Sequence, residues 1–286
     1  MNTGAAAAAF GAQSVAASGL QSVAGAALAP ATGYYLQYFH RSASGVASNV
    51  IVSPLFTTDA ATGAVEVVTS TLMINTTASA TSFASATDHV VSSQANRAVF
   101  LHINGLGTVA GAPPTLSNVL FGGVAATLVQ APAGASGKEW SALYVAVNPA
   151  AGARACSMDA SSSQNAFSVR AVECKNVNQA VPVEGSAIVT SGSSFVATLA
   201  FTRTVVSGGN MLLSRIGIES GGLQAELSVT GGATLIAAEQ TGTSTSSDIT
   251  DGTSYEAAPS AGANGHTYNW TTVKRASLSW AEVRKA

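Results

Sequence analysis

Charged side chains, aromatic side chains and cysteines are scarce in this chain of 286 residues. Asp, Glu, Lys and Arg make up 9% of the chain, against roughly 25% in an average soluble domain. The net charge of −2 supplies no basic field that would attract nucleic acid or an anionic membrane surface. Two cysteines are too few for the disulfide framework of a small secreted domain.

Long apolar runs are also missing, because none approaches the ~20 residues of a membrane span. The first residues, Met1 to Gly4, lack the positive charge that begins a signal peptide, so we expect synthesis in a cytoplasm. Hydrophobic residues, mostly Ala and Val, make up 47% of the chain, which excludes disorder. A globular surface with so few charges dissolves poorly as a free monomer. We therefore expect a homo-oligomer or burial against other proteins.

The charges are distributed unevenly along the chain. Residues 1–95 hold only Arg41, Asp59, Glu66 and Asp88. The first thirty residues are rich in Ala, which favours helix, and in Gly, which costs about 1 kcal/mol in one, so a loose helix and an extended arm both remain open. No repeat of 20–50 residues is found, which excludes a solenoid. We predict an N-terminal attachment region or small domain over 1–79 and a separate domain over 80–286.

The pattern beyond residue 80 is typical of β-strands. Gly122-Gly123 separates two such segments and suits a type I′ hairpin turn, whose two central residues need positive φ. Trp140 to Val147 is apolar on both faces, as a central strand is, so we expect Trp140 to be buried. Further strands are predicted over 97–104, 118–121, 124–130, 154–158, 168–175, 195–202, 211–218, 225–230, 234–239 and 275–284. The fold class is all-β: an antiparallel β-sandwich of jelly-roll type.

Several segments follow one another in an order that resembles a known family. They are Asn96 to Val99, Asn118 to Val129, Trp140 to Gly152, Phe167 to Val172, Asn178 to Val183 and Arg275 to Arg284. This set is similar to concanavalin-like β-sandwich modules of tailed-phage and prophage virion proteins. The resemblance covers about residues 80–286. It implies a virion surface protein, made in the bacterial host, with other virion proteins as partners and contact with host glycans as a further option. It supplies no catalytic residue.

Catalytic and metal-binding patterns are absent from the sequence. No Walker loop, HExxH, paired CxxC, EF-hand loop or GxSxG elbow occurs. The histidines, His40, His89, His102 and His266, are scattered, so we expect no metal, no cofactor and no enzyme. The nearest pair of acids, Asp248 and Asp251, lies in a Ser/Thr/Gly-rich segment. We expect a solvated loop there, with a bound cation or a catalytic acid pair as alternatives.

Three further groups are candidate sites. Cys156 and Cys174 lie on strands predicted to be neighbours, as buried thiols or, alternatively, as a disulfide that cross-links a mature particle. The aromatic cluster Tyr34, Tyr35, Tyr38 and Phe39 belongs to the core or anchors the N-terminal region on a partner. Trp270 follows a Gly-rich segment; it packs in the core or, with His266 and Tyr268, stacks on a sugar.

Three functions are weighed. The first is a structural protein of a tailed-phage virion: a capsid decoration, head-fibre or vertex protein whose N-terminal region attaches to the major capsid or tail proteins and whose sandwich is exposed. The alternative is a carbohydrate- or receptor-binding module of a tail tip or tail fibre. The third, a hydrolase on a jelly-roll scaffold, is disfavoured because glycosidases need a carboxylate pair.

Overall fold

The computed structural model describes residues 63–134, 136–205, 208–220, 227–241 and 248–286, together with the backbone of four two-residue strands nearer the N-terminus. The contacts divide the chain into two units, Met1–Thr62 and Gly63–Ala286. The short strands of the first unit form two antiparallel pairs: β1 (Gly33–Tyr34) with β4 (Phe56–Thr57), and β2 (Gln37–Tyr38) with β3 (Ile51–Val52). All the remaining strands, β5 to β24, lie in the second unit.

The expected domain boundary at 79/80 is wrong, because residues 63–79 belong to the second unit. β5 (Glu66–Thr76) pairs antiparallel along β14 (Cys156–Lys175), and Met73 and Ile74 of β5 are buried in the core. This strand is rich in Thr and Ser, so its composition hides the fact that one of its faces is covered. The boundary lies at Thr62/Gly63.

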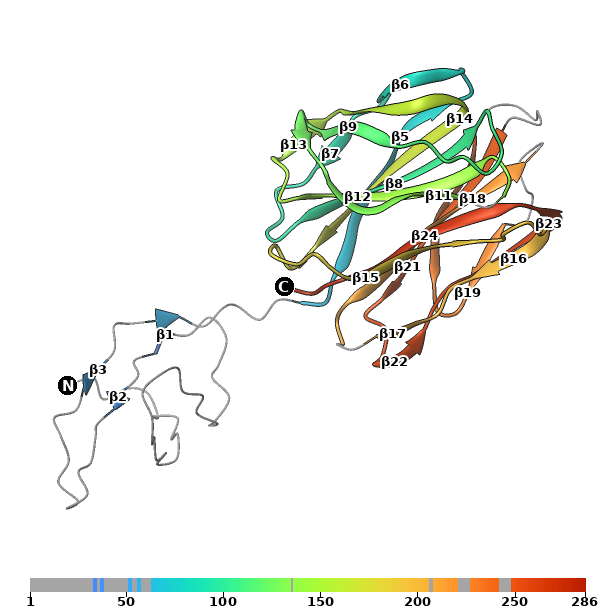
Figure 1. Ribbon diagram of the computed structural model, residues 1–286. Helices are drawn as coiled ribbons and strands as arrows, with labels where there is room; N and C mark the ends of the chain where they lie inside the picture. The colour runs from blue at the N-terminus through green and yellow to red at the C-terminus, as the bar shows by residue number, and fades with distance from the viewer. Residues whose placement is uncertain are drawn as a thin grey trace, which may run out of the picture. The chain divides into compact units, whose positions relative to one another are not determined.

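The prediction of an all-β, antiparallel sandwich fold is confirmed, since the described residues contain strands and no helix. The single sandwich expected for residues 80–286 is wrong, because the second unit holds two of them (Figure 1). The strands of the first sandwich are β5, β6 (Ala80–Ala84), β7 (His89–Val91), β8 (Ala98–Gly107), β9 (Leu116–Phe121), β10 (Val124–Ala125), β11 (Thr127–Gly134), β12 (Glu139–Val147), β13 (Gly152–Arg154) and β14. The strands of the second are β15 (Val183–Thr190), β16 (Val196–Ala200), β17 (Arg203–Val205), β18 (Met211–Ser220), β19 (Ser228–Thr230), β20 (Thr234–Gln240), β21 (Asp248–Ala257), β22 (Gly262–Asn264), β23 (Thr267–Lys274) and β24 (Ala276–Val283).

The two sandwiches have the same topology. The large sheet runs β5-β14-β8-β12-β11 in the first and β15-β24-β18-β21-β20 in the second. A smaller layer covers each: β6 and β9 pair with the early part of β14, and β16 and β19 pair with β23. The pairs β7–β13 and β17–β22 also correspond. The second unit is therefore a tandem repeat of one sandwich, here called the first and the second repeat.

One strand differs in continuity between the repeats. β14 is a single strand of 20 residues that passes from the small layer to the large sheet, and its pairing with β6 shifts between Asp159 and Gln164. The separate strands predicted over 154–158 and 168–175 are thus its two ends. In the second repeat the same path is divided into β23 and β24.

The turns support the repeat independently of the pairing. Asn148 and Gly152 have φ of 46° and 100°, and the corresponding Ala258 and Gly262 have φ of 45° and 125°. A left-handed alanine is uncommon, so its occurrence at the place of Asn148 indicates that the turn geometry is common to both repeats. The predicted type I′ turn is confirmed, since Gly122 and Gly123 have φ of 61° and 78° between the paired Phe121 and Val124.

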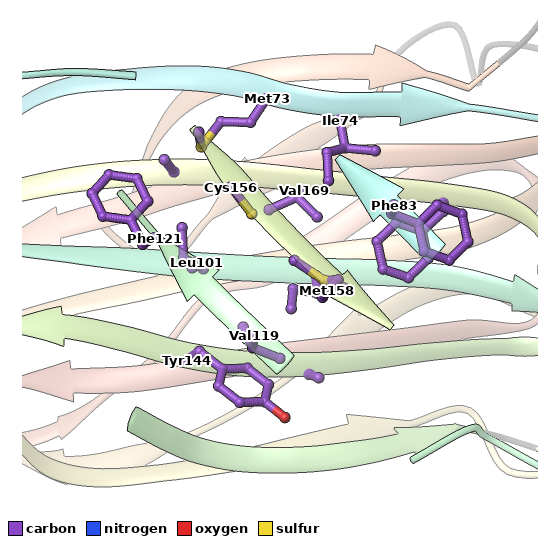
Figure 2. Close-up of a cluster of buried hydrophobic side chains, with 14 of the residues drawn as sticks. Met73, Ile74, Phe83, Leu101, Val119, Phe121, Tyr144, Cys156, Met158 and Val169 are labelled. Carbon is purple, nitrogen blue, oxygen red and sulfur yellow. The ribbon is translucent and has the colours of Figure 1, made fainter. Parts of the chain in front are cut away.

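Each repeat has its own apolar core between its two layers. The first core includes Leu101, Val169, Phe121 and Met158 (Figure 2). The second is built from the inner faces of β18 and β24 and from β23. Trp140 is 1% exposed, as predicted; its Nε1 donates to Gln164 Oε1 at 2.7 Å, and a Cβ on the paired Gly105 would overlap its ring.

The two large sheets pack face to face. β8 lies against β18, β12 against β24, β14 against β21 and β11 against β15. Exchanging each strand for its counterpart in the other repeat returns the β8–β18 pair and converts β12–β24 into β14–β21, so an approximate two-fold axis runs between β8 and β18. A third apolar cluster fills one end of this interface, with Phe100 and Val172 of the first repeat against Leu213 and Ala281 of the second. The middle of the interface is polar.

Candidate functional site

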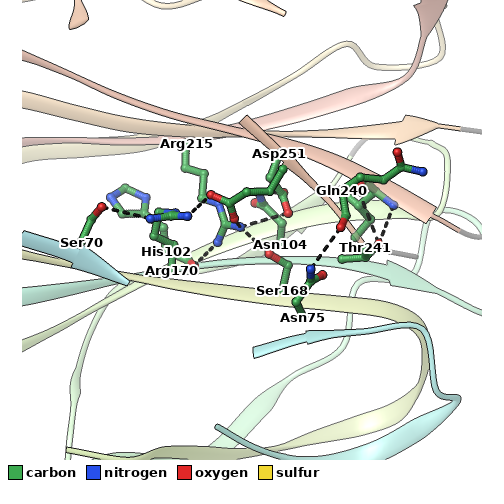
Figure 3. Close-up of polar contacts among 12 residues, drawn as sticks. Ser70, Asn75, His102, Asn104, Ser168, Arg170, Arg215, Gln240, Thr241 and Asp251 are labelled. Carbon is green, nitrogen blue, oxygen red and sulfur yellow. Dashed lines mark hydrogen bonds and ion pairs between the residues drawn. The ribbon is translucent and has the colours of Figure 1, made fainter. Parts of the chain in front are cut away.

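The largest group of buried polar side chains lies between the two repeats, where their large sheets meet (Figure 3). We call it the polar seam. It consists of His102, Asn104, Ser141, Ser168 and Arg170 from the first repeat and Arg215, Glu239, Asp251, Ser277 and Ser279 from the second. Because the facing sides of seven strands supply these side chains, three from the first repeat and four from the second, the packing of the two sheets brings them together.

Arg215 is the centre of the seam and is fully buried. Its Nη2 lies 3.0 Å from Asp251 Oδ2 and also donates to Ser168 Oγ. Its Nη1 donates to the carbonyl oxygen of His102 at 2.8 Å. One guanidinium thus joins both repeats through charge-assisted hydrogen bonds, which are stronger than neutral ones.

Asp251 is held from both repeats as well. Asn104 Nδ2 donates to Asp251 Oδ1 at 2.6 Å and to the carbonyl oxygen of Ile216 at 3.0 Å. Gly217 of the second repeat corresponds to Asn104 of the first. A Cβ added to Gly217 would lie 2.9 Å from Asn104 Cγ. The close approach of the sheets at this point therefore requires glycine in one repeat and allows asparagine in the other.

One ion pair joins the two repeats at the edge of the seam. Arg170 Nη2 contacts Glu239 Oε1, and Arg170 Nη1 donates to Ser70 Oγ at 3.0 Å. His102 Nδ1 lies 3.0 Å from Ser279 Oγ. Burial, with a smaller contribution from the charge of Arg215, lowers the pKa of His102 to about 3, so this imidazole is neutral at physiological pH.

The polar seam is suited to fixing the orientation of one large sheet relative to the other. Removing one partner of a buried ion pair leaves an uncompensated charge, which costs about 3–5 kcal/mol. Any rotation or slip of one sheet over the other would separate Arg215 from His102 and Asp251 from Asn104. Only a weak signal in the sequence indicates the seam: Ser277 and Ser279 alternate with Leu278 and Trp280, a pattern equally typical of a strand with one solvated face.

Each repeat also holds a buried carboxylate on its last strand. Glu173 lies 3.5 Å from His89 Nε2 and accepts hydrogen bonds from the backbone N and Oγ of Ser92. At the corresponding place Glu282 accepts from Arg203 Nε at 2.7 Å. In both repeats this carboxylate ties strand β7 or β17, through His89 or Arg203, to the large sheet, so its role is structural.

A serine, a histidine and a glutamate come together inside the second repeat. Ser214 Oγ lies 2.6 Å from His266 Nδ1, and Glu256 Oε2 lies 3.9 Å from His266 Nε2. The order of ring nitrogens is the reverse of that in a serine-hydrolase triad, where Nε2 takes the proton of the serine. Ser214 and His266 are fully buried, and burial lowers the pKa of His266 to about 4. A substrate could reach Ser214 only by opening the sandwich.

The predicted sugar contacts are wrong, because all three side chains are core. His266 and Tyr268 are fully buried and Trp270 is 5% exposed. The Tyr268 hydroxyl bonds to Ser214 and Ser254 at 2.9 and 2.7 Å. Tyr268 and Trp270 of β23 belong to the core cluster that includes residues of β18 and β24, so the alternative of a core position for Trp270 is confirmed.

The expectation of two buried thiols is confirmed. The alternative of a disulfide is wrong, because Cys156 and Cys174 occupy opposite ends of the one strand β14, whereas bonded cysteines need Cα atoms within roughly 7 Å. Burial raises the pKa of the Cys156 thiol to about 12 and also raises that of Cys174, so neither is a reactive thiolate.

The solvated loop predicted around Asp248 and Asp251 is a strand, β21, and both carboxylates are buried. Asp251 is 1% exposed and pairs with Arg215 at 3.0 Å. In the part of the chain that the structure describes, no group of three or more His, Cys, Asp or Glu side chains could hold a metal ion.

The aromatic cluster belongs to the first unit. Tyr34 lies in β1 and Tyr38 in β2. Tyr35, Phe39 and all four side chains lie outside the described residues, so the attachment role of this cluster stays a prediction.

Comparison with protein-family models, with curated proteins and with solved structures finds no match to this chain. Among the described residues, no helix has the length and apolar character needed to cross a membrane.

Proposed function

We propose that this chain is a non-enzymatic structural protein of a tailed-phage virion. Residues 1–62 attach it to capsid or tail proteins, and the two repeats form the exposed part. A head decoration, head fibre or vertex protein fits this arrangement. The resemblance of the sandwich segments to virion modules suggested this role.

The observation that carries the proposal is the contrast between the two units. Met1–Thr62 contains only two charged residues, Arg41 and Asp59, and burying such a segment against a partner avoids the large cost of desolvating charge. In the second unit, by contrast, the Arg170–Glu239 ion pair and the hydrogen bonds of Arg215 to His102 and Ser168 join the two sandwiches. A rigid body joined to a nearly uncharged segment suits a protein that is anchored at one end and exposed at the other.

The nucleophile and acid-base groups of the repeats support a non-enzymatic role. The Ser214–His266 pair is sealed in a core, the acids Asp248 and Asp251 are buried, and the thiols are protonated. The alternative of a receptor-binding module loses His266, Tyr268 and Trp270 as contacts, so it requires another exposed site.

Deletion of residues 1–62 tests the proposal. Particles are purified from a host that carries the phage or prophage encoding the chain, and the protein is quantified by mass spectrometry. We expect the full chain in the particles, and we expect the truncated chain to keep its β-sheet circular dichroism but to be lost from them. The matched control is Arg284→Ala in the full chain, at an exposed ion pair, which should be incorporated normally. Absence of the full chain from particles, or normal incorporation of the truncated chain, would contradict the proposal.

A further inference from the structure

A shallow hollow lies on the outer layer of the first repeat. Its volume is about 290 Å³, at the small end of ligand pockets and suited to one ring-sized group. Its lining residues are Ser82, Phe83, Ala84, Asn118, Ser157, Met158 and Asp159. These come from β6, β9 and the early part of β14, three strands that pair side by side.

A carboxylate in a fixed position forms the polar side of the hollow. Asp159 Oδ1 accepts a hydrogen bond from Ser82 Oγ at 2.7 Å, and Asp159 Oδ2 accepts one from Asn118 Nδ2 at 2.7 Å. These two bonds lower the pKa of Asp159, so the group is ionised at physiological pH. Each carboxylate oxygen keeps a further lone pair for a ligand.

The backbone is distorted where Asn118 meets Asp159. Between the pairs Ser157–Leu120 and Asp159–Ser117, β9 contains one residue more than β14, which is a β-bulge. Asn118 lies in this bulge with φ of 51°. A left-handed non-glycine residue is strained, and such strain and bulges concentrate at functional sites, where they re-aim a side chain. Here the bulge accompanies the contact of the Asn118 amide with Asp159.

The second repeat provides an internal comparison. Thr198 and Asn269 are paired there at the positions of Ser82 and Asp159. The carboxylate is therefore replaced by a neutral amide. The pairing of β19 with β23 is regular, without the bulge. The same fold thus forms without the acidic group and without the strain, so neither is required by the fold.

We propose that the hollow around Asp159 binds a neutral sugar through two neighbouring hydroxyl groups. Asp159 accepts hydrogen bonds, while Asn118, Ser82 and Ser157 can both donate and accept them, which matches hydroxyls that do the same. Ala84 supplies exposed apolar surface for the ring carbons, and Phe83 and Met158 line the hollow from the core side, where they are 6% and 2% exposed. Ca²⁺ fits less well, because it takes about 6–8 oxygen ligands and prefers several carboxylates. Asp159 is the one carboxylate among the residues that line this hollow. Sugar binding goes beyond attachment to a virion and does not depend on it.

The test uses the ¹⁵N-labelled full chain, titrated separately with glucose, galactose, mannose, N-acetylglucosamine and CaCl₂ while amide chemical shifts are recorded. We expect at least one sugar to shift the amides of residues 82–84, 117–119 and 157–159 in a saturable way. Asp159→Asn installs the residue of the second repeat and should weaken that binding at least 10-fold. Asp88→Asn, which removes an exposed carboxylate elsewhere in the first repeat, should leave it unchanged.

The outcomes separate this site from the proposed virion role. Absence of shifts with every sugar, sugar binding that survives Asp159→Asn, or shifts at these amides with CaCl₂ alone would each overturn the sugar site. Equal melting temperatures for the wild type and Asp159→Asn verify that the variant is folded. Incorporation of Asp159→Asn into particles should be normal, so failure of sugar binding and failure of particle attachment are observed in different experiments.

Discussion

The two repeats share a topology but differ in what their outer and inner faces carry. The outer layer of the first repeat has the Asp159 hollow with its bulge and left-handed Asn118; the second has Asn269 and a regular ladder. On the facing sheets, Asn104 of the first repeat meets Gly217 of the second, and Arg215 takes the place of His102. The topology thus tolerates exchange of polar groups wherever a partner on the facing sheet satisfies them.

Loss of Arg215 should be among the most damaging changes. Arg215→Ala leaves Asp251 buried without its cation, so we expect the free energy of unfolding to fall by about 3–5 kcal/mol. Urea denaturation measures the change. Arg284→Ala, at an ion pair whose side chains are 43% and 33% exposed, is the control and should cost less than about 1 kcal/mol. Equal effects of the two changes would show that the seam does not hold the repeats together.

Trp140→Ala should have an effect of comparable size, about 3–5 kcal/mol, because a large buried side chain leaves a cavity. The first repeat depends on this ring and on Gly105 opposite it, whereas the second has Thr250 and Ile218 at the corresponding places. Thr250→Ala should therefore cost clearly less in the same urea experiment. A loss near zero for Trp140→Ala would show that the core of the first repeat is packed differently.

The buried histidines should make the protein sensitive to acid. The pKa of His102 is lowered to about 3 and that of His266 to about 4, so the unfolded state binds protons first as the pH falls below about 6.5. The stability is therefore complete above pH ~6.5 and is lost toward pH ~4, by up to about 1.4 kcal/mol per pH unit for each histidine. His102→Asn should make the slope of unfolding free energy against pH shallower. An unchanged slope would contradict the burial of His102.

Exchange of the buried carboxylates should have smaller effects. Glu173→Gln and Glu282→Gln keep the shape and remove the charge, which costs about 1–3 kcal/mol when a hydrogen bond to a charged group is lost. Glu282 pairs with Arg203, which is always charged, and Glu173 with His89, whose pKa burial lowers. We therefore expect Glu282→Gln to be the more destabilising of the two at pH 7, as measured by thermal unfolding. The reverse order would show that His89 is charged in the folded protein.

Much of the strand pattern could be predicted from the sequence. Trp140 to Val147 is apolar on both faces, and Gly122-Gly123 tolerates the two positive φ angles of a type I′ turn, so local chemistry indicates both. The tandem repeat escaped prediction because its unit is longer than the 20–50 residues searched. The available signal of the repeat was the recurrence of two turns. One turn contains Gly122-Gly123 and recurs at Gly231-Gly232, and the other contains Pro149 and recurs at Pro259.

The candidate sites were harder to predict, since burial there depends on the other repeat. Ser277 and Ser279 form a polar strand face that water could cover; here the first repeat covers it, with His102 Nδ1 3.0 Å from Ser279 Oγ. Asp251 likewise lies in a segment with the composition of a loop; Asn104 of the first repeat covers it, with Asn104 Nδ2 2.6 Å from Asp251 Oδ1. The Asp159 hollow depends on a bulge, which no residue pattern around Asn118 specified.

The most direct test of the central claim, that the seam joins the two repeats into one body, uses the three tryptophans as reporters. Trp140 lies in the first repeat, and Trp270 and Trp280 lie in the second. One variant carries Trp270→Phe and Trp280→Phe, the other Trp140→Phe, and circular dichroism follows the whole fold in each during urea unfolding. We predict that in each variant the fluorescence and circular dichroism transitions coincide in midpoint and slope. A tryptophan signal that changes at a separate urea concentration from the circular dichroism would contradict the account, because the repeats would then unfold independently.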